Sequence, residues 1–200
     1  PVTSTKKMIP KDFKKGLGEK YSNKAGNLYS WIYMEEPALN KVLKEYVSGD
    51  MTLLDLGCGD GRVFKNYIKS GIKEENIFGI DVDRLLIRKA YITYPKSHVR
   101  TANVLHNFHF KNKFNIALSI HVLHFFNIKQ LCSVFKKLSR LLDDNGVLIF
   151  LIAHPIRWVS DDLSKYFQRK EREIKTTWGT KIFMNQNTIL AFILKKYGLR

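Results

Sequence analysis

Apolar and polar positions alternate in blocks along the middle of the chain. Short apolar runs bounded by turn residues predict buried strands at residues 51–56, 77–81, 99–104, 114–120 and 147–152. The stretches between them predict helices at residues 62–69, 84–92 and 128–142, the last with an apolar stripe at helical spacing. Strands that are apolar throughout and alternate with helices predict an open, mainly parallel sheet with helices on both faces, which is an α/β fold.

The helix at residues 128–142 has the clearest boundaries. Asn127 lies where its side chain can cap the first turn. The run Asp143-Asp144-Asn145-Gly146 is typical of a turn that stops a helix. We therefore expect this helix to end in a loop before the strand at residues 147–152.

The two ends of the chain lack this alternation. Residues 1–25 are polar, basic and aperiodic, and predict an N-terminal arm. Residues 28–46 predict helices, which Pro37 is expected to divide because proline interrupts a helix interior. Residues 154–185 mix aromatic and charged side chains, which favours a lid over a further sheet layer, and residues 187–197 predict a last helix.

The predicted organisation is a single domain in three parts. The arm at residues 1–25 precedes a core at residues 26–153, and residues 154–200 form the lid and the final helix. Gly198 is expected to end that helix on the way to another strand. We therefore expect the sequence to be a fragment that lacks the last strands of the sheet.

The charge of the chain is strongly positive. Its 200 residues include 34 lysines and arginines against 18 aspartates and glutamates, a net charge of +16, which favours a polyanionic partner such as RNA. The cations are spread along the whole sequence, however, and most are lysines, although arginine is better suited to bidentate phosphate binding. The charge is therefore better interpreted as a solvated surface or a preference for acidic acceptors, with RNA as the second choice.

Two further observations bear on where the protein acts and on whether it binds a membrane or a metal. The longest apolar run, residues 147–153, is far shorter than the roughly 20 residues of a membrane-spanning helix. The two cysteines, Cys58 and Cys132, provide neither a disulfide framework nor the spacing of a metal site. We therefore expect a cytoplasmic protein without a membrane or a metal partner.

The stretch after the first predicted strand carries the strongest chemical signal. Asp55 is followed by Gly57, Gly59 and Gly61, and the next predicted strand ends at Asp81. Glycines allow a sharp turn and a close approach of the backbone to a ligand at the carboxyl end of a strand. The helix that follows offers free N–H groups to an anionic group, and a carboxylate 22 residues after Gly59 is placed to bind ribose hydroxyls.

This stretch has two weaker interpretations. A glycine turn with an unrelated acid downstream needs no ligand, but here strand, glycines, helix, strand and acid follow one another in order. A dinucleotide site has the pattern G-x-G-x-x-G, whereas these glycines form G-x-G-x-G, and the acid two residues before them lies outside that pattern.

The same residues carry a family resemblance. The stretch L-L-D-L-G-C-G-D-G at residues 53–61 resembles the first motif of class I S-adenosylmethionine-dependent methyltransferases, and I-F-G-I-D-V-D at residues 77–83 resembles the second. Three later stretches also resemble the family, namely its fourth strand, the loop after that strand and a helix-turn-strand, at residues 114–117, 119–124 and 138–150. The resemblance covers residues 50–152 and implies a Rossmann-like fold that uses S-adenosylmethionine as its cofactor.

The resemblance also implies roles for individual residues. The first motif and the loop after the fourth strand would surround the methionine part of the cofactor with Asp55, Gly57, Cys58, Gly59 and Ser119. The second motif would bind the ribose through Asp81, and the adenine would be flanked by Val82, Asn103 and Val104. The family usually has aspartate at positions 103 and 115, where this chain has asparagine.

The residues on the acceptor side are less well defined. Methyl transfer is an in-line attack on a sulfonium methyl group, which needs alignment and, for some acceptors, a general base. Candidate bases at predicted strand ends are His154, which is favoured, His124 and His121, each with a purely structural role as the alternative. Aromatic side chains that either wall an acceptor site or pack between helices are Tyr21, Tyr29, Trp31, Tyr33, Trp158, Tyr166 and Trp178.

Three functions remain open on the sequence alone. The lid-like segment and the lack of a nucleic-acid module favour methyl transfer to a small-molecule acceptor. The basic charge favours an RNA- or ribosome-associated methyltransferase as an alternative. The asparagines at positions 103 and 115 favour a second alternative, a non-catalytic methyltransferase-like subunit.

Overall fold

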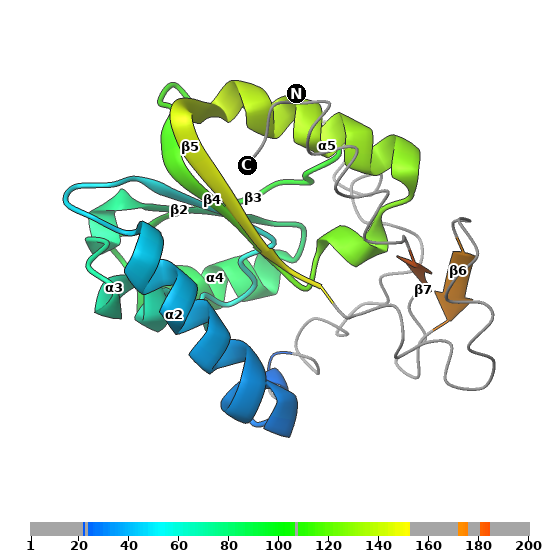
Figure 1. Ribbon diagram of the computed structural model, residues 1–200, viewed down its shortest axis with the longest axis horizontal. Coiled ribbons are helices and arrows are strands. Elements are labelled where there is room, and N and C mark those ends of the chain that lie inside the picture. The colour runs from blue at the N-terminus through cyan, green and yellow to red at the C-terminus, as the bar shows by residue number, and fades with distance from the viewer. Residues whose placement is uncertain (1–21, 23, 107, 153–171, 176–180, 185–200) are drawn as a thin grey trace.

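The computed structural model describes residue 22 and residues 24–106, 108–152, 172–175 and 181–184 (Figure 1). In chain order these residues form the π-helix η2 (Trp31–Glu35), α2 (Glu36–Tyr46), β1 (Leu53–Leu56), α3 (Phe64–Lys69), the 3-10 turn η3 (Glu74–Asn76), β2 (Ile77–Asp81), α4 (Arg84–Thr93), β3 (His98–Thr101), β4 (Phe114–Ile120), the 3-10 turn η4 (Leu123–Phe125), α5 (Ile128–Leu141), β5 (Leu142–Leu151), β6 (Arg172–Lys175) and β7 (Lys181–Met184).

The strands β1 to β5 form one parallel sheet in the order β3-β2-β1-β4-β5. Leu53 of β1 pairs with Ile77 on one side and with Ile116 on the other. The strand order reverses between β1 and β4, and the end of the sheet where β1, β2 and β4 finish is called the carboxyl edge below. An open α/β sheet binds its ligands at such a reversal, so the fold places the site there.

Each face of the sheet has its own hydrophobic core. On one face, the apolar stripe of α5 packs against Leu54 and Leu56. On the other face, Leu43 of α2 and Phe64 of α3 pack together with Leu53. Figure 1 shows the same arrangement, with α5 on one side of the sheet and α2, α3 and α4 on the other. The predicted α/β fold with both faces covered is confirmed.

The helical region before β1 consists of two helices, η2 ending at Glu35 and α2 beginning at Glu36, so the expected division falls immediately before Pro37. Pro37 lies in the first turn of α2, where a missing N–H group is not needed. The π-helix η2 precedes it, and in this turn the N–H of Glu36 donates to the carbonyl of Trp31, five residues earlier. Because this wider turn ends immediately before the proline, the backbone stays helical through it.

The loop expected after α5 was predicted wrongly. Asn127 caps the helix as expected, accepting a hydrogen bond from the N–H of Gln130. The helix ends at Leu141, but Leu142 already pairs with Phe114 as the first residue of β5. The next pair joins Val147 to Ile116, so residues 143–146 form an irregularity inside the strand. The reason is the buried Leu142, which draws the backbone into the sheet before the polar residues begin.

β3 is shorter than expected at its end. It stops at Thr101, because the side chain of Asn103 accepts a hydrogen bond from the N–H of Leu105 at 2.9 Å and turns the chain. β3 is an outer strand of the sheet. The chain that follows it places Asn103 and Val104 at the carboxyl edge.

The segment after β5 contributes a separate antiparallel pair, in which Arg172 of β6 pairs with Met184 of β7. β7 contacts η4, which follows β4. The predicted arm, except for its last residues, most of the predicted lid and the predicted helix at residues 187–197 lie outside the described residues. Over the part of the chain that is described, no helix has the length and apolarity needed to cross a bilayer.

Candidate functional site

The backbone turns sharply where β1 ends. Gly57, Gly59 and Gly61 have φ angles of 81°, 57° and 76°, in the left-handed region that glycine adopts without strain. The N–H of Gly57 donates to the carbonyl of Ile80 at 2.7 Å, which ties the turn to β2. A Cβ atom on Gly57 would overlap Cγ2 of Val122, which follows β4. The turn is therefore pressed between the ends of β2 and β4, and only glycine fits at position 57.

Asp81, the last residue of β2, is held by two backbone donors. Its Oδ2 accepts from the N–H of Gly59 at 2.9 Å, and its Oδ1 accepts from the N–H of Asp83 at 2.8 Å. Burial raises the pKa of Asp81 to about 6, although these hydrogen bonds oppose the shift. The group is therefore mostly a carboxylate at neutral pH, fixed beside the glycine turn with remaining acceptor capacity for hydroxyl groups.

Asp55, within β1, has one satisfied and one unsatisfied oxygen. The hydroxyl of Tyr67 on α3 donates to Oδ2 at 2.8 Å, while Oδ1 is buried without a hydrogen-bond partner among the described residues. Burial raises the pKa of Asp55 to about 7, with the Tyr67 hydrogen bond acting in the opposite direction. An orphaned carboxylate oxygen two residues before the glycine turn is suited to a cationic group of a ligand.

The remaining residues predicted for the cofactor also reach the carboxyl edge, but with different exposure. Val82 is half-buried after Asp81, whereas Asn103 and Val104 are buried after β3. Ser119 is fully buried, and its Oγ donates to the carbonyl of Leu56 at 3.5 Å, so its hydroxyl faces β1.

Two further residues near the motifs, Cys58 and Asn115, lie in different environments. Cys58 is a free thiol buried in the glycine turn, and its burial raises its pKa well above the usual value, which keeps the thiol protonated. Asn115 accepts from the N–H of Thr52 at 2.9 Å and donates to Asp143 at 3.1 Å. It lies at the opposite end of β4 from the carboxyl edge, so its departure from the usual aspartate does not touch the site.

Two of the three candidate histidines lie at the end of β4. His121 has a φ of 58°, and its Nε2 lies 2.8 Å from Oε2 of Glu35 in η2. Burial lowers the pKa of His124 in η4 to about 3, so this ring stays neutral in the physiological range. His154 lies outside the described residues. Within the described ranges, no three histidine, cysteine, aspartate or glutamate side chains gather as a metal site requires.

The segment before α2 covers the glycine turn, which the sequence analysis missed. The guanidinium of Arg62 lies 3.9 Å from the centre of the Trp31 ring, and Ser22 donates a hydrogen bond to Asp60. Trp31 is buried, while Tyr29 is exposed. No local signal marks these pairs, because their members are separated by thirty or more positions and meet only in the folded chain.

The aromatic candidates that the structure describes, Tyr29, Trp31 and Tyr33, do not form one wall. Tyr33 is also exposed, and its ring stacks on that of Tyr29 with the centroids 6.1 Å apart. The other aromatic candidates lie outside the described residues, namely Tyr21, Trp158, Tyr166 and Trp178. The described aromatic residues therefore do not define an acceptor site.

Comparison with known proteins shows which family this chain is similar to. The family model described as a methyltransferase domain matches residues 54–150, which include the glycine turn, Asp81 and the end of β4. A protein of Invertebrate iridescent virus 6, provisionally named a methyltransferase (235L), is 30% identical over 107 residues. That match covers 54% of this chain and 39% of the viral protein, so this chain spans about two fifths of the length of that curated relative.

Solved structures show the same fold. Protein PH0226 from Pyrococcus horikoshii superposes with a TM-score of 0.68 at 20% identity, covering 89% of this chain and 88% of the other. CalS10, an amino pentose methyltransferase from Micromonospora echinaspora solved with S-adenosylmethionine bound, superposes with a TM-score of 0.66 at 12% identity, covering 90% and 88%. With the family match, these structures confirm the Rossmann-like fold and the resemblance drawn from the motifs.

Proposed function

We propose that this chain, whose residues 54–150 form a methyltransferase domain of the class I S-adenosylmethionine-dependent type, transfers a methyl group from that cofactor to a small-molecule acceptor. The observation that carries the proposal is the joint placement of the glycine turn at Gly57 and the carboxylate of Asp81, joined by the N–H of Gly59. Nucleoside ligands bind at this position in open α/β sheets.

The residues at the carboxyl edge fit the cofactor group by group. Asp81 would accept hydrogen bonds from the ribose hydroxyls, and the orphaned Oδ1 of Asp55 would face the cationic methionine end. Val82 and Val104 would flank the adenine, with Asn103 beside them. S-adenosylmethionine supplies, when bound, a methyl group made electrophilic by its sulfonium sulfur. The chain supplies alignment, which accounts for much of the acceleration of a two-substrate reaction.

Two observations support a small-molecule acceptor. CalS10, which shares the fold over most of this chain, is named an amino pentose methyltransferase. In addition, β7 contacts η4 and so brings part of the segment after β5 to the end of β4. The net charge of +16 would favour an acidic acceptor. Both cysteines are free thiols, which fits a reducing compartment such as the cytoplasm.

Cofactor binding is the first test. Isothermal titration of the full chain with S-adenosylmethionine should give saturable binding, and Asp81→Ala should weaken it at least about tenfold, which is 1.4 kcal/mol. The loss is expected because the ribose hydroxyls would lose their acceptor. Asp83→Asn is the matched control, because Asp83 caps α4 through the N–H groups of Leu85 and Leu86 and asparagine also caps. No binding by the unmodified chain would refute the proposal.

The acceptor class is tested by transfer of label. The full chain is incubated with methyl-labelled S-adenosylmethionine and a cell extract separated into small-molecule, RNA and protein fractions. Label in the small-molecule fraction is the expected result. Label confined to RNA would replace the proposed acceptor, and cofactor binding without transfer to any fraction would favour a non-catalytic subunit.

One observation favours RNA as the second candidate. The exposed face of α5 carries Lys129, Lys136 and Arg140, which lie on one side of the helix at the spacing of turns. A basic stripe of this kind can follow a phosphate backbone. If it does, RNA binding should weaken steeply as salt rises from about 50 to 200 mM, and binding that is absent at the lower salt would remove this candidate.

A further inference from the structure

Glu35 and His121 form a contact that cofactor binding does not explain. Nε2 of His121 lies 2.8 Å from Oε2 of Glu35, although the residues are 86 positions apart. Their side chains are 18% and 21% exposed, so most of the contact is shielded from solvent. A hydrogen bond to a carboxylate in such a place is stronger than one in bulk water.

The chemistry of the two groups fixes where the proton lies. The hydrogen bond from His121 lowers the pKa of Glu35, so the carboxylate is ionised and can only accept. The shared hydrogen therefore sits on Nε2. In the neutral ring this leaves Nδ1 as the nitrogen that accepts a proton.

The backbone also places His121 at the proposed methyl-transfer site. His121 directly follows β4, and the next residue, Val122, lies against the glycine turn at Gly57. The N–H of His121 donates to the carbonyl of Leu151 at 2.8 Å, which anchors the left-handed backbone at the end of the sheet. The histidine is thus held at the part of the carboxyl edge where the methionine portion of the cofactor would lie.

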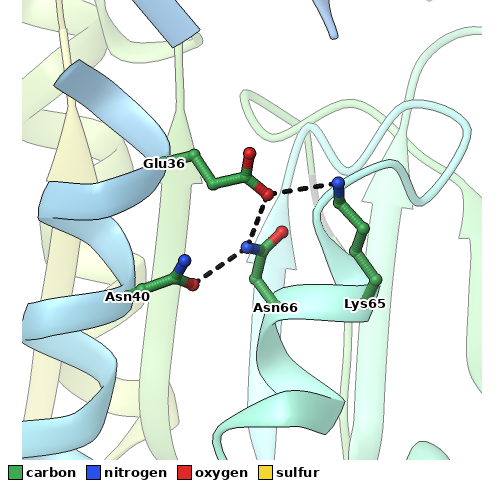
Figure 2. Close-up of polar contacts among 4 residues, drawn as sticks. All are labelled: Glu36, Asn40, Lys65 and Asn66. Carbon is green, nitrogen blue, oxygen red and sulfur yellow. Dashed lines mark hydrogen bonds and ion pairs between the residues drawn. The ribbon is translucent and has the colours of Figure 1, made fainter. Parts of the chain in front are cut away.

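Glu35 is held in place by its neighbours on the helix. Asn66 of α3 donates through Nδ2 to Glu36 Oε1 and to Asn40 Oδ1, both at 2.9 Å. Figure 2 shows Glu36 and Asn40 converging on Asn66, with Lys65 reaching the same oxygen of Glu36 as Asn66 does. These contacts fix the rotation of α2 against α3. The adjacent Glu35 is thereby directed elsewhere around the helix, to the histidine.

We infer that Glu35 is a positioning residue for methyl transfer, and that it acts by fixing the orientation and the proton-accepting tautomer of His121. This inference rests on the proposed function. As the lone pair of the acceptor atom forms a bond to the methyl carbon, the carbon–sulfur bond breaks and its electron pair remains on sulfur. The proton of the acceptor atom passes to Nδ1 of His121, and the carboxylate of Glu35 stabilises the imidazolium through the Nε2–H.

His124 is less suited to the same role. Burial disfavours its charged form strongly, so it would resist taking up a proton. Its Nδ1 is buried without a hydrogen-bond partner among the described residues, and burial and His121, not a carboxylate, set its pKa there. The carboxylate partner is therefore the feature that separates His121 from its neighbour.

The first test reads the tautomer and needs no acceptor. Nitrogen-15 spectra of the histidine rings are recorded for the full chain with S-adenosylhomocysteine at about pH 8, where imidazole is ordinarily neutral. The His121 signals are assigned by their loss in His121→Asn. The expected result is a proton on Nε2 in the unmodified chain and a mixture of tautomers in Glu35→Gln. A proton on Nδ1, or no change in Glu35→Gln, would overturn the inference.

The second test separates positioning from folding. With the acceptor found above, Glu35→Gln should lower kcat about 100-fold, the scale of general-base catalysis, while the Kd for S-adenosylmethionine changes by less than about twofold. Glu45→Gln on the adjoining helix α2 is the matched control, because Glu45 is exposed and its replacement removes the same charge, and its kcat should be unchanged. An unchanged kcat in Glu35→Gln refutes only the inference, whereas no transfer by the unmodified chain refutes the proposed function.

Discussion

The carboxyl edge has two halves that are built in different ways. The half at β1 and β2 consists of the glycine turn, Asp55 and Asp81, which lie within 27 positions of one another in the sequence. The half at the end of β4 combines His121 with Glu35, which arrives from a helix near the start of the described chain. The first half is a local supersecondary unit, whereas the second exists only after the N-terminal helices have docked.

The difference shows which part of a shared fold can vary. Backbone N–H groups and one carboxylate at fixed positions are enough for the first half, so its sequence pattern is recognisable. The second half depends on one long-range pair, and such pairs can be exchanged without changing the sheet. Function-specific residues are therefore expected among the long-range contacts at β4 rather than in the glycine turn.

The largest expected effect comes from a substitution at Gly57, where the glycine turn of the first half contacts Val122 of the second. In Gly57→Ala the new Cβ would overlap Val122 and would also hold an L-residue at a φ of 81°. Strain and overpacking should together lower the free energy of unfolding by about 4 kcal/mol, measured by urea denaturation.

Gly49→Ala separates the two causes in that experiment. Gly49 has a φ of 59°, but nothing lies within 4 Å of the position a Cβ would take. It should cost only the strain, about 1 kcal/mol. Equal losses of unfolding free energy in the two variants would show that the close contact with Val122 adds nothing to the cost at Gly57.

The next effect concerns Asp55 and depends on pH. Its pKa is about 7 in the folded chain against an ordinary value of 3.8, so the folded state binds the proton more tightly than the unfolded state. The free energy of unfolding should therefore fall as pH rises from 3.8 to about 7 and then level off. Asp55→Asn should remove the part of this fall that comes from Asp55, because the amide oxygen can still accept from Tyr67 but cannot become charged. A smaller fall from Asp81, whose pKa is raised to about 6, remains in both proteins.

Denaturation of Asp55→Asn and the unmodified chain at several pH values tests this expectation. Near pH 4 the two should be similar, and above pH 7 the variant should be more stable by on the order of 3 kcal/mol. The same variant should bind S-adenosylmethionine more weakly, because Asp55 would no longer offer a charge. A stability difference that is constant across the pH range would show that burial does not raise the pKa of Asp55.

The smallest expected effect is on cofactor affinity at low pH. The pKa of Asp81 is about 6, and the ribose hydroxyls need its carboxylate form. The affinity for S-adenosylmethionine should therefore be lower in acid, with Kd rising about tenfold between pH 7 and pH 5. Titration calorimetry on Asp55→Asn isolates this contribution from that of Asp55. A Kd that does not vary in that variant would remove Asp81 from the ribose site.

Much of this could be predicted from the sequence, for physical reasons that differ between residues. The strands and the glycine turn were found because apolar runs and glycines at strand ends are local properties. Asp81 was found because the length of one strand–helix–strand unit sets its distance from the turn. Asp55 was placed correctly in the motif, but its hydrogen bond to Tyr67 depends on how α3 packs on the sheet.

The errors came from tertiary contacts that override local preferences. Asp143 to Gly146 looked like a loop, but the buried Leu142 begins β5 before them. Pro37 was expected to divide the helical region, and the change from η2 to α2 does occur one residue before it, although the backbone stays helical. Glu35 carried no signal at all, because an acidic residue in a helix is ordinary until its partner 86 positions away is known.

The π-turn at Trp31–Glu35 has a consequence for how this chain aligns with its relatives. A turn with a hydrogen bond to the fifth residue back holds one residue more than an ordinary helical turn, so it is what a single-residue insertion into an α-helix leaves behind. Deleting one residue there would restore the α-helix and rotate everything upstream of it by about 100° relative to α2. The Trp31 ring would then lose its contact with the Arg62 guanidinium. A relative without the insertion is therefore expected to cover its glycine turn with different side chains.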